Sequence, residues 1–211
     1  MDPNTQRWLN EAGYHYHCFI SWPHLEDHEI AQCARAVKNA IKTELGYSVP
    51  DPKVFLDETE MKPGDVWPEA LRNALCKSLA MVAICAPIYY DPSHTWCGLE
   101  WAAMELLGDR RLNGETYRAI IPIVLRQRSG VPGPVAKFQY VDFSKTSVQG
   151  RHYFSTIEFR KQMGQVVERI EQIAETIARL ERRPDCESFA FPTESAFAHL
   201  LVPPQKLPFR E

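Results

Sequence analysis

Apolar residues in this chain gather in short continuous runs, and these runs alternate with segments whose apolar positions recur every three or four residues. Residues 79–86 (LAMVAICA) and 119–125 (AIIPIVL) are almost wholly apolar, as is typical of strands covered on both faces of a sheet. Residues 16–21 (YHCFIS), 54–56 and 138–143 predict three further short strands. The pattern therefore predicts five strands.

The segments between these strands predict helices over residues 26–45, 68–78 and 96–107. Strand and helix alternate along the chain, and such alternation predicts a parallel sheet with helices on both of its faces. The expected fold class is therefore α/β, with a five-stranded parallel sheet between two helical layers.

A long helix is predicted over residues 155–183. Its apolar positions alternate four and three residues apart, as in a heptad seam. The members of this seam are Phe159, Met163, Val166, Ile170, Ile173, Ile177 and Leu180. Two interpretations remain open: the helix docks on the sheet as its last helix, or its end projects and pairs with another chain.

The two ends of the chain differ in character from the part between them. We expect an N-terminal extension over residues 1–13, a folded domain over residues 14–183 and a tail over residues 184–211. Five prolines rule out a long helix in the tail, and Phe189, Phe191 and Phe197 could anchor it to the body or to a neighbour.

Composition narrows the class of protein and its location. The chain has 211 residues and a net charge of -3, which argues against a broad surface for nucleic acid or membrane. It has no apolar run of about 18 residues and no apolar signal segment near its start. The cysteines form no C-x-x-C pair, which favours free thiols in a reducing cytoplasm over a disulfide framework. They are Cys18, Cys33, Cys76, Cys85, Cys97 and Cys186.

Ligands of open parallel sheets bind outside the carboxyl ends of the strands. Ser21, Asp57 and the loop that follows Pro87 all come at such ends. Nearby, the stretch HTWCGLEWAAMELL, residues 94–107, places the charged Glu100 inside an otherwise apolar helix. These residues mark the candidate site.

Three stretches, taken in order, resemble a TIR (Toll/interleukin-1 receptor) domain. YHCFISW, residues 16–22, resembles the first strand of that family. VFLDETEMKPGDVWPEAL, residues 54–71, resembles its second strand, BB loop and following helix. SLAMVAICAPIYYDPSHTWCGLE, residues 78–100, resembles its third strand, S/P-x-Y segment and W-x-x-x-E signature. The resemblance covers about residues 14–180 and implies a flavodoxin-like, three-layer fold. This chain departs from the family at His17, where an aspartate is frequent, and at Trp22.

Some TIR domains are adhesive scaffolds, and others resemble NAD-consuming enzymes with one catalytic glutamate in the W-x-x-x-E segment. The resemblance assigns that role to Glu100. Nicotinamide in NAD+ is already a cationic leaving group, so its departure needs no general acid, and one carboxylate can stabilise the oxocarbenium-like ribose. Glu100 lies in the first turn of its helix, where the dipole favours an anion. The alternative is that Glu100 only complements that helix end.

Five residues are candidate contacts for NAD+. Trp96, one helical turn before Glu100, could stack on a base and, in family terms, influence whether the product is linear or cyclised; the alternative is a core aromatic. Ser21 and Trp22 could reach phosphate or ribose. Asp57 could accept from a ribose or base, or bond its own backbone. Lys62, in the candidate BB loop, could approach the diphosphate, although that loop also resembles the family's self-association surface.

Other chemistries have less support in the sequence. His24 and His28 have a ligand spacing, but no third metal ligand is evident, and no P-loop or dinucleotide-binding glycine motif occurs. Cys97 lies beside the site without a histidine placed by sequence. We therefore expect no cofactor and no metal, with NAD+ as a substrate.

The expected function is cleavage of NAD+ to nicotinamide and an ADP-ribose-derived signal, which is possibly cyclic. The alternative is a non-enzymatic TIR adaptor that acts through BB-loop self-association. The chain resembles standalone bacterial antiphage (Thoeris-like) TIR proteins, in which a separate effector responds to the product. Self-association through the TIR domain is expected, and no nucleic-acid or membrane partner is expected.

Overall fold

The computed structural model describes residues 1–24, 28–60, 67–91, 95–125, 133–143 and 153–198. The strands are β1 (Tyr16–Ser21), β2 (Val54–Phe55), β3 (Ser78–Cys85), β4 (Ile120–Val124) and β5 (Val141–Asp142). The α-helices are α1 (Pro3–Ala12), α2 (His28–Leu45), α3 (Asp57–Glu60), α4 (Trp67–Cys76), α5 (Thr95–Arg111), α6 (Gly133–Ala136), α7 (Ile157–Arg179) and α8 (Glu194–Phe197). Two 3-10 helices are η1 (Pro87–Tyr90) and η2 (Tyr153–Ser155).

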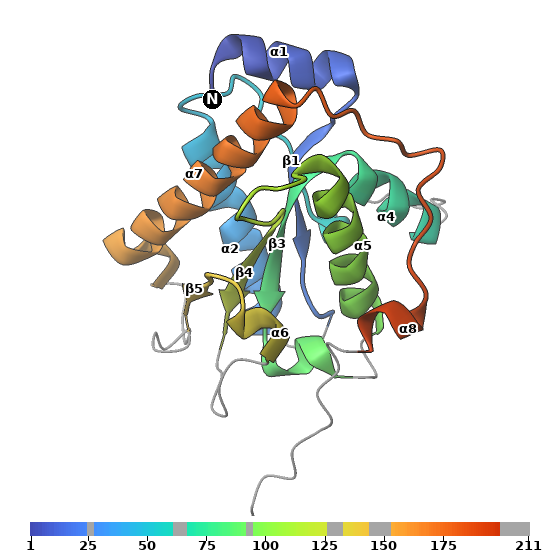
Figure 1. Ribbon diagram of the computed structural model, residues 1–211. Helices are drawn as coiled ribbons and strands as arrows, with labels where there is room; N and C mark the ends of the chain where they lie inside the picture. The colour runs from blue at the N-terminus through green and yellow to red at the C-terminus, as the bar shows by residue number, and fades with distance from the viewer. Residues whose placement is uncertain (25–27, 61–66, 92–94, 126–132, 144–152, 199–211) are drawn as a thin grey trace, which may run out of the picture.

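The five strands form one parallel sheet in the order β2-β1-β3-β4-β5 (Figure 1). Helix α2 packs with α7, and α4 packs with α5, so that helices form two layers around the sheet. The α/β class and the five-stranded parallel sheet predicted from the sequence are confirmed. Strand β1 has the bounds that its apolar run predicts, and β5 is shorter than the predicted range of 138–143.

The core lies on both faces of the central strands. All eight residues of β3 are buried, as the continuous apolar run predicts. On α7 the heptad seam from Phe159 to Ile177 is buried in the body of the domain, and only its last member, Leu180, is partly exposed. The interpretation that this helix docks on the sheet is therefore confirmed.

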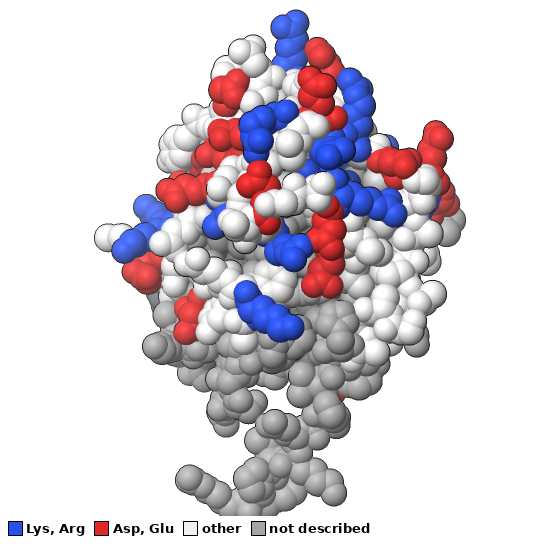
Figure 2. All heavy atoms as spheres, viewed as in Figure 1, with Lys and Arg blue, Asp and Glu red and all other residues white. Residues whose placement is uncertain are grey.

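Charged side chains of both signs are interspersed on the face seen in Figure 2, over the part of the surface that the structure describes. This mixture matches the small net charge of -3. Within the described ranges, every helix is too short or too polar to cross a bilayer.

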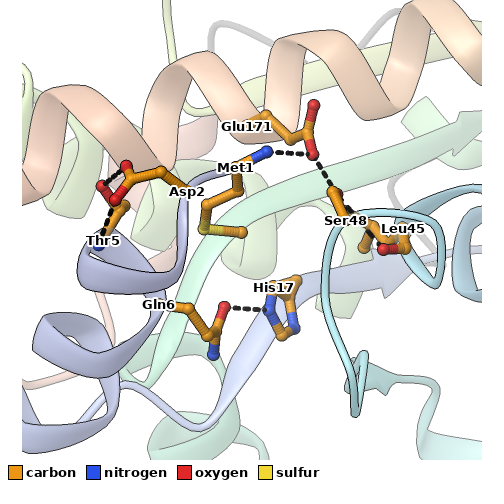
Figure 3. A network of polar contacts seen from close by, with 8 residues as sticks. All are labelled: Met1, Asp2, Thr5, Gln6, His17, Leu45, Ser48 and Glu171. Carbon is orange, nitrogen blue, oxygen red and sulfur yellow. Dashed lines mark hydrogen bonds and ion pairs between the residues drawn. The ribbon is translucent and has the colours of Figure 1, made fainter.

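Helix α1 lies at the amino ends of the strands (Figure 1), in the segment that the sequence predicts only as an N-terminal extension. Asp2 caps the helix by accepting from two backbone amides. Leu9 is fully buried, and Gln6 reaches the buried His17 at the start of β1 (Figure 3). His17 accepts from the Lys53 amide through Nδ1 at 3.0 Å, so its Nε2 carries the proton and donates to Gln6 Oε1 at 3.0 Å.

A second contact of the same segment reaches α7. The amino group of Met1 forms an ion pair with Glu171 Oε1 at 2.7 Å, and the Ser48 hydroxyl donates to the same oxygen (Figure 3). The ion pair and the hydrogen bond lower the pKa of Glu171, although partial burial acts in the opposite direction. Residues from three distant parts of the chain are thus tied together at this end.

Arg111, at the end of α5, is a buried cation at the same end of the sheet. Its guanidinium donates to the Ser78 carbonyl at 2.7 Å and to the Cys76 carbonyl at 2.5 Å, and it lies 5.2 Å from the centre of the Tyr14 ring. Burial lowers the pKa of Arg111. The guanidinium binds the turn that joins α4 to β3.

The C-terminal segment runs along the outside of α4 and α5 to α8 (Figure 1). A disulfide joins Cys76 to Cys186, and Arg72 donates to the carbonyls of Cys186 and Phe189. The expectation of free thiols throughout is therefore wrong for this pair. The two residues are 110 positions apart, so no local spacing indicated the bond. Phe189 is buried, which shows that the tail is anchored to the body.

Candidate active site

Glu100 points inward from the second turn of α5 toward the carboxyl end of β1. The prediction that it lies in the first turn is wrong, because the helix begins at Thr95 and has no acidic residue in its first turn. Its side chain is 6% exposed, and its Oε2 accepts a hydrogen bond of 2.5 Å from the Ser21 hydroxyl. Ser21 is the last residue of β1 and is itself buried. The sheet therefore brings together two of the predicted site residues that are 79 positions apart in the sequence.

Burial raises the pKa of Glu100 to about 8, with a smaller contribution from the negative charge of Asp57, while the hydrogen bond from Ser21 acts in the opposite direction. A carboxyl with this pKa is largely protonated at neutral pH in the free protein. Such a shift is frequent at active sites, because a group that titrates near neutral pH can change charge during a reaction. Nearby positive charge on a bound substrate would favour the ionised form.

Tyr89 extends this hydrogen-bonded chain. Its hydroxyl lies 2.7 Å from Ser21 Oγ and 3.4 Å from the Cys97 carbonyl oxygen. Burial raises the pKa of Tyr89 well above its usual value, so the phenol keeps its proton. With the Ser21 proton directed at Glu100, Tyr89 is the donor to Ser21, and both hydroxyls support a negative charge on Glu100.

A second cluster forms around Asp57, at the end of β2. Its Oδ1 accepts from Trp22 Nε1 at 3.1 Å and from the Glu58 amide at 2.8 Å, and its Oδ2 lies 2.6 Å from His24 Nε2. The Trp22 and His24 rings are stacked with centroids 4.3 Å apart. The carboxylate of Asp57 is thus held by three donors from the protein, one of which is the adjacent backbone amide.

Trp96 lies one turn before Glu100 on α5 and is partly buried. Its ring packs edge-on against Phe191 of the C-terminal segment, with centroids 6.0 Å apart. Trp101 is fully buried, as expected of a packing residue. Lys62 lies outside the described residues, so its predicted contact stays a prediction.

The contacts of Tyr89 and the role of His24 were not predicted from the sequence. Tyr89 lies in the YY pair after Pro87, and only the loop as a whole was assigned to the site. His24 was weighed as a metal ligand with His28, and the structure instead pairs it with Asp57. In the described ranges, no group of three His, Cys, Asp or Glu side chains is arranged to hold a metal ion.

Comparison with known proteins identifies the fold family. A family model described as TIR domain matches residues 18–154, more than half of the chain. This chain belongs to the TIR domain family. The match includes Ser21, Asp57, Trp96 and Glu100, and it ends before α7 and the C-terminal segment.

Among solved structures, the chain is similar to the crystal structure of the TIR domain of the Toll-related receptor TRR-2 from Hydra magnipapillata. The two are 20% identical, the alignment covers 70% of this chain and 98% of that chain, and the TM-score is 0.40. No curated protein matches the sequence. The TIR fold is therefore established here by the family model together with the parallel five-stranded sheet.

Proposed function

We propose that this TIR domain cleaves the bond between nicotinamide and ribose in NAD+. The observation that carries the proposal is the buried Glu100, which is bonded to Ser21 at the carboxyl end of the sheet and has a pKa of about 8. A buried acid adds nothing to a scaffold surface, and burying its charge opposes folding. Its position is that of the glutamate in the W-x-x-x-E signature that the resemblance makes catalytic.

Cleavage moves positive charge onto the ribose. The C–N bond breaks, its electron pair leaves with neutral nicotinamide, and C1′ gains oxocarbenium character. Glu100 would accept from a ribose hydroxyl and stabilise that charge, and the pyridinium of the bound substrate would lower its pKa into the ionised range. Ser21 and Tyr89 hold the carboxylate in place and share its charge.

The wider role that we propose is a signalling one. The ADP-ribosyl product, linear or cyclic, would act on a separate effector protein in cytoplasmic antiphage defence, and self-association through the TIR domain would control the activity. The resemblance to standalone bacterial TIR proteins supports this role. A non-enzymatic adaptor that self-associates is the rival function.

The test is incubation of the full chain with NAD+ at high protein concentration, with nicotinamide and ADP-ribose products measured by chromatography and mass spectrometry. Glu100→Gln removes the carboxylate and keeps its shape. Glu105→Gln, further along α5 and outside the Ser21–Glu100 contact, is the matched control. Nicotinamide from wild type and from the Glu105→Gln protein, and none from Glu100→Gln, supports the enzyme. No nicotinamide from any of the three favours the adaptor.

A further inference from the structure

His24 and Asp57 form a histidine–carboxylate pair beside Glu100. His24 follows β1 and Asp57 follows β2, so adjacent strands place them together. Nε2 of the ring lies 2.6 Å from Asp57 Oδ2, and the ring stacks on Trp22, which is bonded to the same carboxylate. The imidazole is thus held in position by both a hydrogen bond and an aromatic neighbour.

This arrangement defines the tautomer of His24. A carboxylate can only accept, so the shared proton is on Nε2, and Nδ1 of the neutral ring has a lone pair. Over the part of the chain that the structure describes, no hydrogen-bond partner faces Nδ1. The His24 side chain is 53% exposed, while Asp57 is 6% exposed. A buried acid that orients a solvent-accessible imidazole is the geometry of an activated general base.

The pair is electrostatically linked to the proposed catalytic carboxyl. The negative charge of Asp57 contributes to the raised pKa of Glu100. Trp22 is also adjacent in sequence to Ser21, which donates to Glu100. Two acids that interact electrostatically therefore have different partners, one a serine hydroxyl and the other an imidazole, as in sites that divide two roles between two carboxyl groups.

We propose that His24 is the general base that deprotonates the acceptor of the ADP-ribosyl group, and that Asp57 is the residue that positions it. The inference rests on the proposed function. After nicotinamide leaves with the C–N electron pair, the oxygen of a water or hydroxyl group forms a bond to C1′. Its proton passes to Nδ1 of His24, the resulting imidazolium is stabilised by Asp57, and the exposed ring returns the proton to solvent.

Three readouts in the Glu100-intact protein separate this step from cleavage. The first is hydrolysis of NAD+ between pH 5 and 9. The second is exchange of labelled nicotinamide into NAD+, which needs cleavage and its reversal but no base. The third is formation of the azide adduct, because azide is an anion with no proton to lose. The variant is His24→Gln, and the matched control is His15→Gln, an exposed histidine at the opposite end of the sheet.

For His24→Gln we expect hydrolysis to fall roughly 100-fold at pH 7, while the rise of the rate with pH that Glu100 causes is kept. Nicotinamide exchange should stay within about 3-fold of wild type, and azide should restore product formation, since neither requires the base. The His15→Gln protein should match wild type in all three readouts. Thermal unfolding of each variant confirms that it is folded.

Unchanged hydrolysis in His24→Gln overturns the proposal. An equal fall in hydrolysis, exchange and azide capture also overturns it, because it would mean that His24 only shapes the site. Absence of nicotinamide release from wild type refutes the proposed function itself, which is a separate result. If His24→Gln does not fold, His24→Asn is tested in the same way and should lose hydrolysis while keeping exchange.

Discussion

At the amino ends of the strands, buried polar groups are fully matched by partners that need no change of charge. His17 is bonded through both ring nitrogens, and Arg111 is bonded to two backbone carbonyls. At the carboxyl ends, Glu100 accepts from the Ser21 hydroxyl, and burial together with the negative charge of Asp57 raises its pKa to about 8. One end of the sheet uses buried polar groups for stability, and the other keeps an acid that opposes folding when it ionises.

The largest expected effect is the contribution of Glu100, at the carboxyl ends of the strands, to the pH dependence of the free energy of unfolding. The folded-state pKa of Glu100 is raised, so between about pH 4.5 and 8 the folded chain binds more protons at this site than the unfolded chain does, and the free energy of unfolding falls as pH rises. At about 1.36 kcal/mol per unit, the contribution reaches about 5 kcal/mol. Chemical denaturation at pH 5, 7 and 9 measures it, and Glu100→Gln should flatten this decline. A parallel decline in both proteins would contradict the assignment.

Catalytic activity should depend on the residues at the carboxyl ends of the strands and not on those at the amino ends. Glu100→Gln is expected to lower kcat/KM for nicotinamide release by roughly 1000-fold, because the developing charge on the ribose loses its counter-charge. In wild type, kcat/KM should rise with pH up to about 8 as Glu100 ionises in the free protein. Initial rates across pH measure both effects. A value of kcat/KM that does not change from pH 6 to 9 would contradict a catalytic role for the ionisation of Glu100.

Substitutions at the amino ends of the strands should lower the free energy of unfolding and leave the rate of nicotinamide release unchanged. Arg111→Met keeps the length of the side chain but leaves the Ser78 and Cys76 carbonyls without their guanidinium, and we expect a loss of about 3 kcal/mol in the free energy of unfolding. Denaturant titration measures it. Nicotinamide release by the folded variant should equal that of wild type. A large loss of rate would contradict the conclusion that Arg111 contributes to stability and not to the reaction.

His17 should give the smallest effect, with a sign opposite to that of Glu100. Burial lowers the pKa of His17, so as pH falls below about 6.5 the unfolded chain takes up a proton that the folded chain does not, and stability is lost on the acid side. We expect a loss of stability between pH 7 and 5 that is smaller than the effect of Glu100. His17→Gln should remove this acid-side loss in denaturant titrations. Equal acid sensitivity in both proteins would point to another group.

The main elements of the fold could be predicted from the sequence because the strands are apolar on both faces, as in β3, and because α7 has a regular seam. Helix α1 could not be predicted in this way, since PNTQRWLNEA is mostly polar and depends on Leu9 and Gln6 for its contacts with the body. A helix of this kind takes its stability from packing that the local pattern does not reveal.

The candidate site was predictable in its location and only partly in its contacts. Parallel strands bring their carboxyl ends to one edge, which placed Ser21 and Asp57 near Glu100 before any contact was known. The pairing of Asp57 with His24 was not predicted, because it depends on side chains that follow different strands and on the stacking of the His24 ring on Trp22. Tyr89 is the tyrosine of the S/P-x-Y segment, but its contact with Ser21 was not predicted, because it depends on how the segment folds back over the end of β1.

The Cys76–Cys186 bond divides the polypeptide into a covalent ring with two open arms. The ring contains β3, β4, β5, α5 and α7, and one arm contains β1 and β2. Mechanical tension applied to the chain ends would unravel the arms and leave the ring closed. About 380 Å of contour length, for a separation of 110 residues, would stay hidden until a reductant opened the bond. Ser21 would be pulled away in the arm while Glu100 stayed inside the ring, so the hydrogen bond between them would break when β1 leaves the sheet.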